Sequence, residues 1–170
     1  YRDEAVIPTQ NFNRYSMHAA IDQELGKWFK VGFSTNANYS ITNGASLGLY
    51  NTLSATPIAN PYNKDGSLKQ RINMSNDTQW VYSKSTIESL GDGFKDQTKA
   101  YGAYNNFYGE VKIPWVDGLK YRMNIGLNYR HSDYGNYVGQ GVFSDNANAK
   151  SHATVMDRTM TNWAVENLLT

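Results

Sequence analysis

Hydrophobic and polar residues alternate strictly along residues 119–130. Leu119, Tyr121 and Met123 begin an apolar series at odd positions that ends at Tyr129, whereas Lys, Arg, Asn and Gly fill the even positions. Since successive side chains of a strand point to opposite faces, this segment predicts a strand with one apolar and one polar face. Its length exceeds the roughly 5–6 residues of a usual soluble strand and suits the roughly 9–11 residues that a tilted strand needs to cross a bilayer. The pattern favours a transmembrane β-barrel.

The same alternation predicts an all-β, antiparallel fold with five strands. These strands cover residues 13–25, 28–41, 99–113, 119–134 and 153–170. Tight turns at Gly26-Lys27 and Pro114–Gly118 join two of the strand pairs, and loops at 42–98 and 135–152 make the other connections. Outer-membrane barrels alternate short periplasmic turns with longer extracellular loops in this way. Inside the first loop, residues 45–54 and 82–90 are candidates for short helices.

Composition bounds the class of protein without deciding it. The 170 residues carry 16 basic and 15 acidic side chains, so no strong positive charge indicates a nucleic-acid partner. Thirteen Tyr and nineteen Asn suit strands and polar surfaces better than helices. The mean hydropathy of −0.62 is low, but half of each barrel strand faces a polar interior. A soluble antiparallel sheet with one buried face gives the same alternation, so a soluble β-rich carbohydrate-binding module is the alternative.

Short pieces along nearly the whole chain resemble the SusC/RagA family of TonB-dependent outer-membrane transporters in their order and spacing. The pieces are Val6–Gln10, Arg14–Met17, Ile21–Leu25, Trp28–Gly32, Leu49–Leu53, Pro57–Tyr62 with Asp65-Gly66, Gly118–Asn124 and Asn162–Leu169. The resemblance implies a barrel of 22 antiparallel strands around an N-terminal plug domain. It also implies uptake of glycans or peptides, energised through TonB, with a SusD-like surface lipoprotein as a lid.

The resemblance therefore implies that residues 1–170 are part of the barrel of a nutrient importer. This barrel is expected in the outer membrane of a Gram-negative cell, with its outer surface in contact with lipid. The plug and the TonB-contacting segment are expected upstream of this chain. The expected partners are TonB, the SusD-like lipoprotein and a glycan or peptide substrate.

Two sets of residues are candidates for ligand contact. The first lies on the polar faces of the third and fourth predicted strands and consists of Tyr104, Asn106, Tyr108, Arg122, Asn124, Asn128 and Arg130. Amides both donate to and accept from sugar hydroxyls, but for any single member the favoured interpretation is a hydrated wall whose charges pair with each other or with the plug. The second set consists of the loop aromatics Tyr50, Tyr62, Trp80 and Tyr82. They are candidates for contact with substrate or lid, or for packing the loop.

Catalysis and cofactors find little support in the sequence. His18, His131 and His152 are far apart, and there is no cysteine, so no metal-binding spacing appears. Asn63–Ser67 is read as a β-turn because the alternating oxygen donors of a calcium loop are missing. Gly139-Gln140-Gly141 lacks the third glycine of a nucleotide fingerprint. We expect transport without bond chemistry, no cofactor and no enzyme activity.

Overall fold

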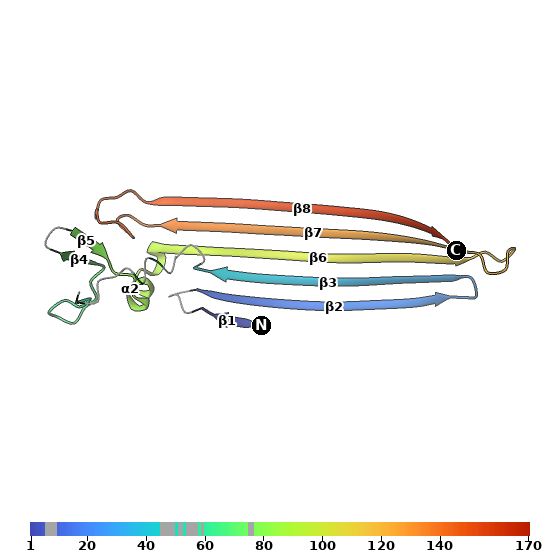
Figure 1. Cartoon of the computed structure of the whole chain (residues 1–170), viewed down its shortest axis with the longest axis horizontal. Coiled ribbons are helices and arrows are strands. Elements are labelled where there is room, and N and C mark those ends of the chain that lie inside the picture. The colour runs from blue at the N-terminus through green and yellow to red at the C-terminus, as the bar shows by residue number, and fades with distance from the viewer. Residues whose placement is uncertain (6–9, 45–49, 51–52, 54–57, 59, 75–76) are drawn as a thin grey trace. The chain divides into compact units, whose positions relative to one another are not determined.

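The computed structural model shows an all-β protein whose main element is an antiparallel sheet (Figure 1). It describes residues 1–5, 10–44, 50, 53, 58, 60–74 and 77–170. The strands are β1 (Arg2–Glu4), β2 (Asn11–Leu25), β3 (Phe29–Asn43), β4 (Arg71–Met74), β5 (Asp77–Trp80), β6 (Phe94–Lys112), β7 (Lys120–Val138) and β8 (His152–Leu169). Six of them form one sheet in the order β1-β2-β3-β6-β7-β8, and β4 pairs with β5. In the described part of the chain, no helix is both long and apolar enough to span a membrane.

The five predicted strands are present as β2, β3, β6, β7 and β8, and most are longer than predicted. β6 starts at Phe94 and β7 ends at Val138, so each has 19 residues. The long loop therefore covers 44–93 instead of 42–98. Alternation is lost at these ends, because residues 95–99 are all polar and because Tyr134, Tyr137 and Val138 place apolar side chains at both even and odd positions. This hid the true ends of the strands.

The long loop has more structure than the sequence indicated. β4 and β5 form an antiparallel hairpin that was not predicted, with Arg71 opposite Trp80. The candidate helix at 82–90 exists as α2 (Lys84–Ser89), followed by the 3₁₀ turn η1 (Gly91–Gly93). The Ser83 hydroxyl caps α2 by accepting a hydrogen bond from the Thr86 amide at 3.1 Å. The candidate helix at 45–54 lies largely outside the described residues.

Cross-strand contacts fix the pairing of the long strands. The Lys112 amide donates to the Trp28 carbonyl, the Ile113 amide donates to the Leu119 carbonyl, and Lys120 and Thr170 exchange both backbone hydrogen bonds. Side chains agree with this register: His18 bonds to Asn36, and Thr35 bonds to Asn105. Even-numbered residues of the long strands share one face and odd-numbered residues share the other.

The chain divides into two compact units, and each is described by itself below. Unit 1 comprises residues 1–13, 41–99 and 133–156, and unit 2 comprises 14–40, 100–132 and 157–170. Unit 1 holds nearly all the buried side chains of the described residues, namely Trp80, Val81, Thr86, Ile87 and Asp96. In unit 2, all of whose residues are described, Ala103 is the only buried hydrophobic side chain.

Candidate functional site

The odd-numbered face of unit 2, here called the apolar face, is exposed although it is hydrophobic. Its exposed large side chains are Tyr15, Met17, Ile21, Leu25, Phe29, Val31, Tyr39, Tyr101, Phe107, Tyr121, Met123, Leu127, Tyr129, Trp163, Val165 and Leu169. Met123 and Leu127 keep 37% and 38% of their surface exposed, so they are not part of a globular core. A contiguous apolar surface of this size marks contact with a membrane or another protein.

Two pairs of polar side chains on the apolar face satisfy each other across neighbouring strands. The Thr35 hydroxyl on β3 donates to Asn105 Oδ1 on β6 at 2.8 Å, and the Tyr121 hydroxyl on β7 donates to Asn167 Oδ1 on β8 at 2.6 Å. Phe33 and Phe107 cover the same strands, with ring centroids 4.7 Å apart. Pairing of this kind removes the cost of placing a lone amide or hydroxyl in a hydrocarbon environment.

Tyrosines mark one border of the apolar face. The Tyr15 and Tyr39 ring centroids lie 6.5 Å apart on β2 and β3, and those of Tyr101 and Tyr129 lie 6.2 Å apart on β6 and β7. Tyr121 lies eight positions before Tyr129, about 26 Å along the strand at roughly 3.3 Å per residue. That spacing matches the apolar band of about 25 Å, flanked by aromatic residues, of an outer-membrane barrel.

The turns near Tyr121 carry further exposed aromatic side chains. Trp28 and Phe29 are 47% and 55% exposed beside the first turn, and Trp115 is 89% exposed in the second. Gly26 and Gly118 have φ values of 73° and 84°, which other residues rarely adopt, so glycine is needed at both turns. Both turns thus present aromatic side chains on the surface.

The even-numbered face of unit 2, here called the polar face, carries a network centred on Tyr108. The Tyr108 ring lies across Gly32 on β3, and its hydroxyl donates a hydrogen bond to Asp22 on β2. A Cβ atom on Gly32 would lie 2.6 Å from Tyr108 Cζ, so only glycine leaves room for the ring. The Tyr108 side chain thereby links β6 to β2, although β3 lies between these strands in the sheet.

Arg122 completes this network from β7. Its guanidinium carbon lies 4.0 Å from the Tyr108 ring centroid, and its Nε donates to Asn124 Oδ1 at 2.9 Å. Arg122 Nη1 lies 3.9 Å from Glu110 Oε2. The stack and the hydrogen bond together hold the plane of the guanidinium.

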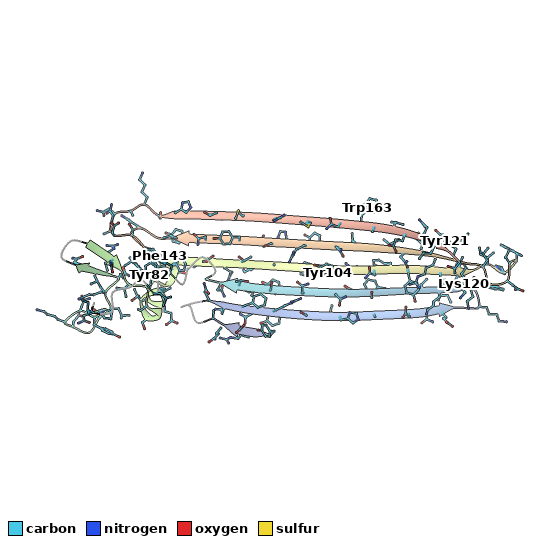
Figure 2. The ribbon with its side chains drawn as sticks, in the orientation of Figure 1. Tyr82, Tyr104, Lys120, Tyr121, Phe143 and Trp163 are labelled. Atoms are coloured by element: carbon cyan, nitrogen blue, oxygen red, sulfur yellow. The ribbon has the colours of Figure 1, made fainter. Side chains whose placement is uncertain are left out.

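The structure brings some of the predicted polar-face candidates together and leaves others apart. Tyr108, Arg122 and Asn124 are in direct contact, and Asn106 Oδ1 approaches Gly126 on the neighbouring strand. Tyr104 is 43% exposed on β6 (Figure 2). Asn128 and Arg130 are exposed on β7, and neither side chain makes a hydrogen bond or ion pair with a described residue. Asp22 and Gly32 were not among the predicted site residues, because alternation assigns a face and does not identify the partner across the strand.

The loop aromatics of unit 1 separate into packed and exposed residues. Phe143 contacts Trp80, Tyr82 and Phe94 with ring centroids 5.4, 5.4 and 4.9 Å away, and Figure 2 shows Tyr82 and Phe143 side by side. Trp80 is only 7% exposed, so it packs the loop and offers no surface to a ligand. Burial raises the pKa of the Tyr82 phenol above its usual value. Tyr50 and Tyr62 are 81% and 51% exposed.

Arg71 ties the hairpin of the long loop to the second loop. Its Nε donates to the Ser144 carbonyl at 2.8 Å, and its Nη2 donates to the Gly141 carbonyl at 2.7 Å. Its guanidinium also lies 5.6 Å from the Trp80 ring. Together with Phe143, Arg71 makes the two loops one packed structure, here called the loop core. No pattern in the sequence indicated this contact across some 70 residues.

The Asn63–Ser67 segment is the turn that the sequence predicted. The Gly66 amide donates to the Asn63 carbonyl at 3.1 Å, and Asp65 Oδ1 accepts from the Ser67 amide at 2.9 Å. The hydrogen bonds from Ser67 also lower the pKa of the Asp65 carboxyl. Its side-chain oxygen thus stabilises the turn.

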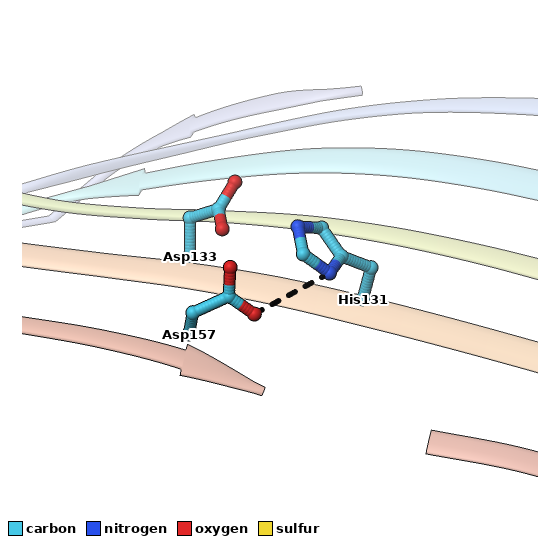
Figure 3. A group of neighbouring side chains, drawn as sticks. All are labelled: His131, Asp133 and Asp157. Carbon is cyan, nitrogen blue, oxygen red and sulfur yellow. Dashed lines mark ion pairs between the residues drawn. The ribbon is translucent and has the colours of Figure 1, made fainter. Parts of the chain in front are cut away.

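The three histidines lie in separate polar contacts. His18 Nδ1 is 2.8 Å from Asn36 Oδ1, and His152 Nε2 is 3.0 Å from Thr154 Oγ1. His131 on β7 lies 2.9 Å from Thr159 Oγ1 and 3.7 Å from Asp157 Oδ1 on β8. Figure 3 shows the ion pair between His131 and Asp157. It also draws Asp133, which follows His131 by two residues in the sequence. Asp157 was not predicted as a partner, because the fifth strand has the weakest alternation.

Comparison with known proteins gives one informative similarity. No family model matches the chain. Over its whole length the chain is 25% identical, in an alignment of 191 residues, to TonB-dependent receptor P3 of Formosa agariphila (strain DSM 15362 / KCTC 12365 / LMG 23005 / KMM 3901 / M-2Alg 35-1). The chain spans 17% of the length of that relative. The chain is therefore similar, from end to end, to a segment of a TonB-dependent receptor.

Proposed function

We propose that this chain is part of the barrel wall of a TonB-dependent nutrient importer in the outer membrane. The observation that carries the proposal is the exposed apolar face of unit 2, which finds no covering in the described part of the chain. Hydrocarbon suits this face, because tyrosines flank it and because Thr35 with Asn105 and Tyr121 with Asn167 form hydrogen-bonded pairs on it. The similarity to a TonB-dependent receptor supports the same assignment.

The finer parts of the proposal follow from the SusC/RagA resemblance. The whole protein would be a 22-stranded barrel with an upstream plug, would import glycan or peptide, and would work with TonB and a SusD-like lipoprotein. It would act by transport, without catalysis or a cofactor. In this arrangement the polar face lines the lumen, and the loop core lies on the extracellular side with Tyr50 and Tyr62 exposed toward substrate or lid.

The open edges of the sheet agree with a larger barrel. β8 has no strand partner on its outer side in the described sheet, and β1 covers only Asn11–Asn13 of β2. Bare strand edges are not tolerated in hydrocarbon. Further strands of the whole protein would have to pair with both edges.

Cysteine labelling tests the proposed faces, because this chain contains no cysteine of its own. Single cysteines are placed at Ile125 and Leu127 on the apolar face and at Asn124 and Asn128 on the polar face of the whole receptor. In intact outer membranes, we expect Asn124→Cys and Asn128→Cys to react with a water-soluble maleimide. Ile125→Cys and Leu127→Cys should react at least tenfold more slowly, since lipid covers them. His131→Cys, two residues beyond Tyr129, should react quickly.

Equal labelling of the two faces would refute the proposed contact with lipid. Recovery of the whole protein in buffer as a folded monomer without detergent would favour the soluble carbohydrate-binding module instead.

A further inference from the structure

Arg122 on the polar face is a prearranged cation whose outer edge remains accessible. Its side chain is 42% exposed, although Tyr108 and Asn124 hold its plane. Of its side-chain nitrogens, only Nε donates a hydrogen bond to another described residue. The 3.9 Å separation from Glu110 exceeds a hydrogen-bond length, so that carboxylate contributes charge without saturating the Nη hydrogens.

The Tyr108 ring on which Arg122 stacks is itself held in place. The Tyr108 ring lies across Gly32, and its hydroxyl is bonded to Asp22, so the ring is held from two strands. A guanidinium on such a platform loses little conformational freedom when it binds a planar anion. This differs from an ordinary surface arginine, which would have to be ordered upon binding.

A hollow of about 380 Å³ lies beside this arginine within unit 2. Its lining includes Arg122, Ser34, Asn106 and Asn124, together with Asp22 and apolar residues such as Phe33 and Phe107. A hydroxyl and two amides offer both donors and acceptors to a polar ligand. The Asp22 carboxylate already accepts the hydrogen bond of the Tyr108 hydroxyl, so Arg122 is the cationic group that the hollow offers to a ligand.

The charge of the polar face favours an anion. Its basic side chains are Arg14, Lys30, Lys112, Lys120, Arg122, Arg130 and Arg158, and its acidic ones are Asp22, Glu24, Glu110 and Glu166. Seven basic and four acidic groups give this face a net charge of +3, whereas the whole chain carries only +1. A surface lined by one sign of charge concentrates ligands of the opposite sign.

We propose that the hollow is a carboxylate-binding subsite and that Arg122 binds the carboxylate through its Nη edge. The ligand is an acidic oligomer, and its hydroxyl or amide groups bond to Ser34, Asn106 and Asn124. This inference rests on the proposed function, because it names the chemical class that passes along the polar face. A guanidinium suits this role, because two of its N–H groups can donate parallel hydrogen bonds to the two oxygens of a carboxylate.

The test uses the whole receptor, purified in detergent, and pairs of probes that differ only in charge. Tetragalacturonate is compared with its fully methyl-esterified form, and tetraglutamate with tetraglutamine, both peptides being blocked at their ends. Calorimetry gives the Kd of each probe. We expect the wild-type receptor to bind one of the acids about tenfold more tightly than its neutral counterpart, and the pair that shows this preference identifies the source of the carboxylate.

Two variants and one matched control locate the effect. Arg122→Gln should bring the ratio of acid to neutral affinity close to one, and Arg122→Lys should restore it only in part, because an ammonium lacks the fork. Arg158→Gln is the control, as Arg158 lies on the same face, on the neighbouring strand β8, and is exposed. It should leave the ratio nearly unchanged.

The proposal is overturned if the wild-type receptor prefers neither acid, if Arg122→Gln keeps the preference, or if Arg158→Gln loses as much of it. A lowered melting temperature of Arg122→Gln with an unchanged affinity ratio would also overturn it, since Arg122 would then hold the protein together. Cysteine labelling decides the membrane location separately, so a failure of this subsite is distinguishable from a failure of the importer assignment.

Discussion

Replacing Gly32 by valine is expected to destabilise the folded receptor by about 3 kcal/mol, at the upper end of the usual cost of overpacking. The new Cβ would meet Tyr108 Cε1 and Cζ and Asp22 Oδ1. The Tyr108 ring would have to leave Gly32, and its hydrogen bond to Asp22 would break with it. Arg122 would then lose the ring on which it stacks. Urea unfolding of the whole receptor in lipid vesicles measures this loss.

Gly109→Val is the matched control, because Gly109 lies inside β6 and a Cβ there would meet nothing within 4 Å. It should change stability little. In a Tyr108→Ala background, Gly32→Val should cost much less than in the wild type, since the ring that it displaces is gone. Equal costs in the two backgrounds would show that Tyr108 does not determine the need for glycine at this position.

Replacing Phe143 by alanine is expected to loosen the loop core by about 3 kcal/mol while the long strands stay folded. Phe143 contacts three aromatic rings, and a buried Phe→Ala change typically costs 3–5 kcal/mol. Partial exposure of the ring places the expected value at the low end. Hydrogen exchange is the suitable measurement, because local opening of the loop raises exchange in 60–93 without changing β7.

Tyr62→Ala is the control within the same loop, since Tyr62 is 51% exposed and lies outside the aromatic cluster. It should leave hydrogen exchange in β4, β5 and α2 as in the wild type. Arg71→Ala should resemble Phe143→Ala, because it removes the two hydrogen bonds to the Gly141 and Ser144 carbonyls. If Phe143→Ala instead raised exchange along β7 as well, the loop core would not be a separate cooperative structure.

Alternation along the chain was enough to predict the fold class and the face of most side chains. Met123 and Leu127 are exposed together on the apolar face, and Tyr108 and Arg122 meet on the polar face, as the odd and even positions indicated. A two-residue period carries this information directly, because every second side chain shares a surface. The five long strands could be found for the same reason.

The cross-strand partners could not be predicted, because they depend on pairing between segments far apart in the chain. Tyr108 and Asp22 are 86 residues apart, and Arg71 and Ser144 are 73 apart. Nothing in the local sequence of Asp22 or Gly32 indicates that a tyrosine of another strand lies there. The loop hairpin was missed because β4 and β5 have only four residues each, too few for a recognisable period.

The fit between Gly32 and Tyr108 has a consequence for how the sheet selects its alignment. A slip of two residues between β3 and β6 keeps every side chain on its proper surface, so polarity alone does not penalise it. After such a slip, however, the phenol would face Lys30 or Ser34 on β3, where a side chain occupies the space that Gly32 leaves empty. Gly32 and Tyr108 together thus disfavour misalignments that the alternation of polar and apolar residues alone would allow.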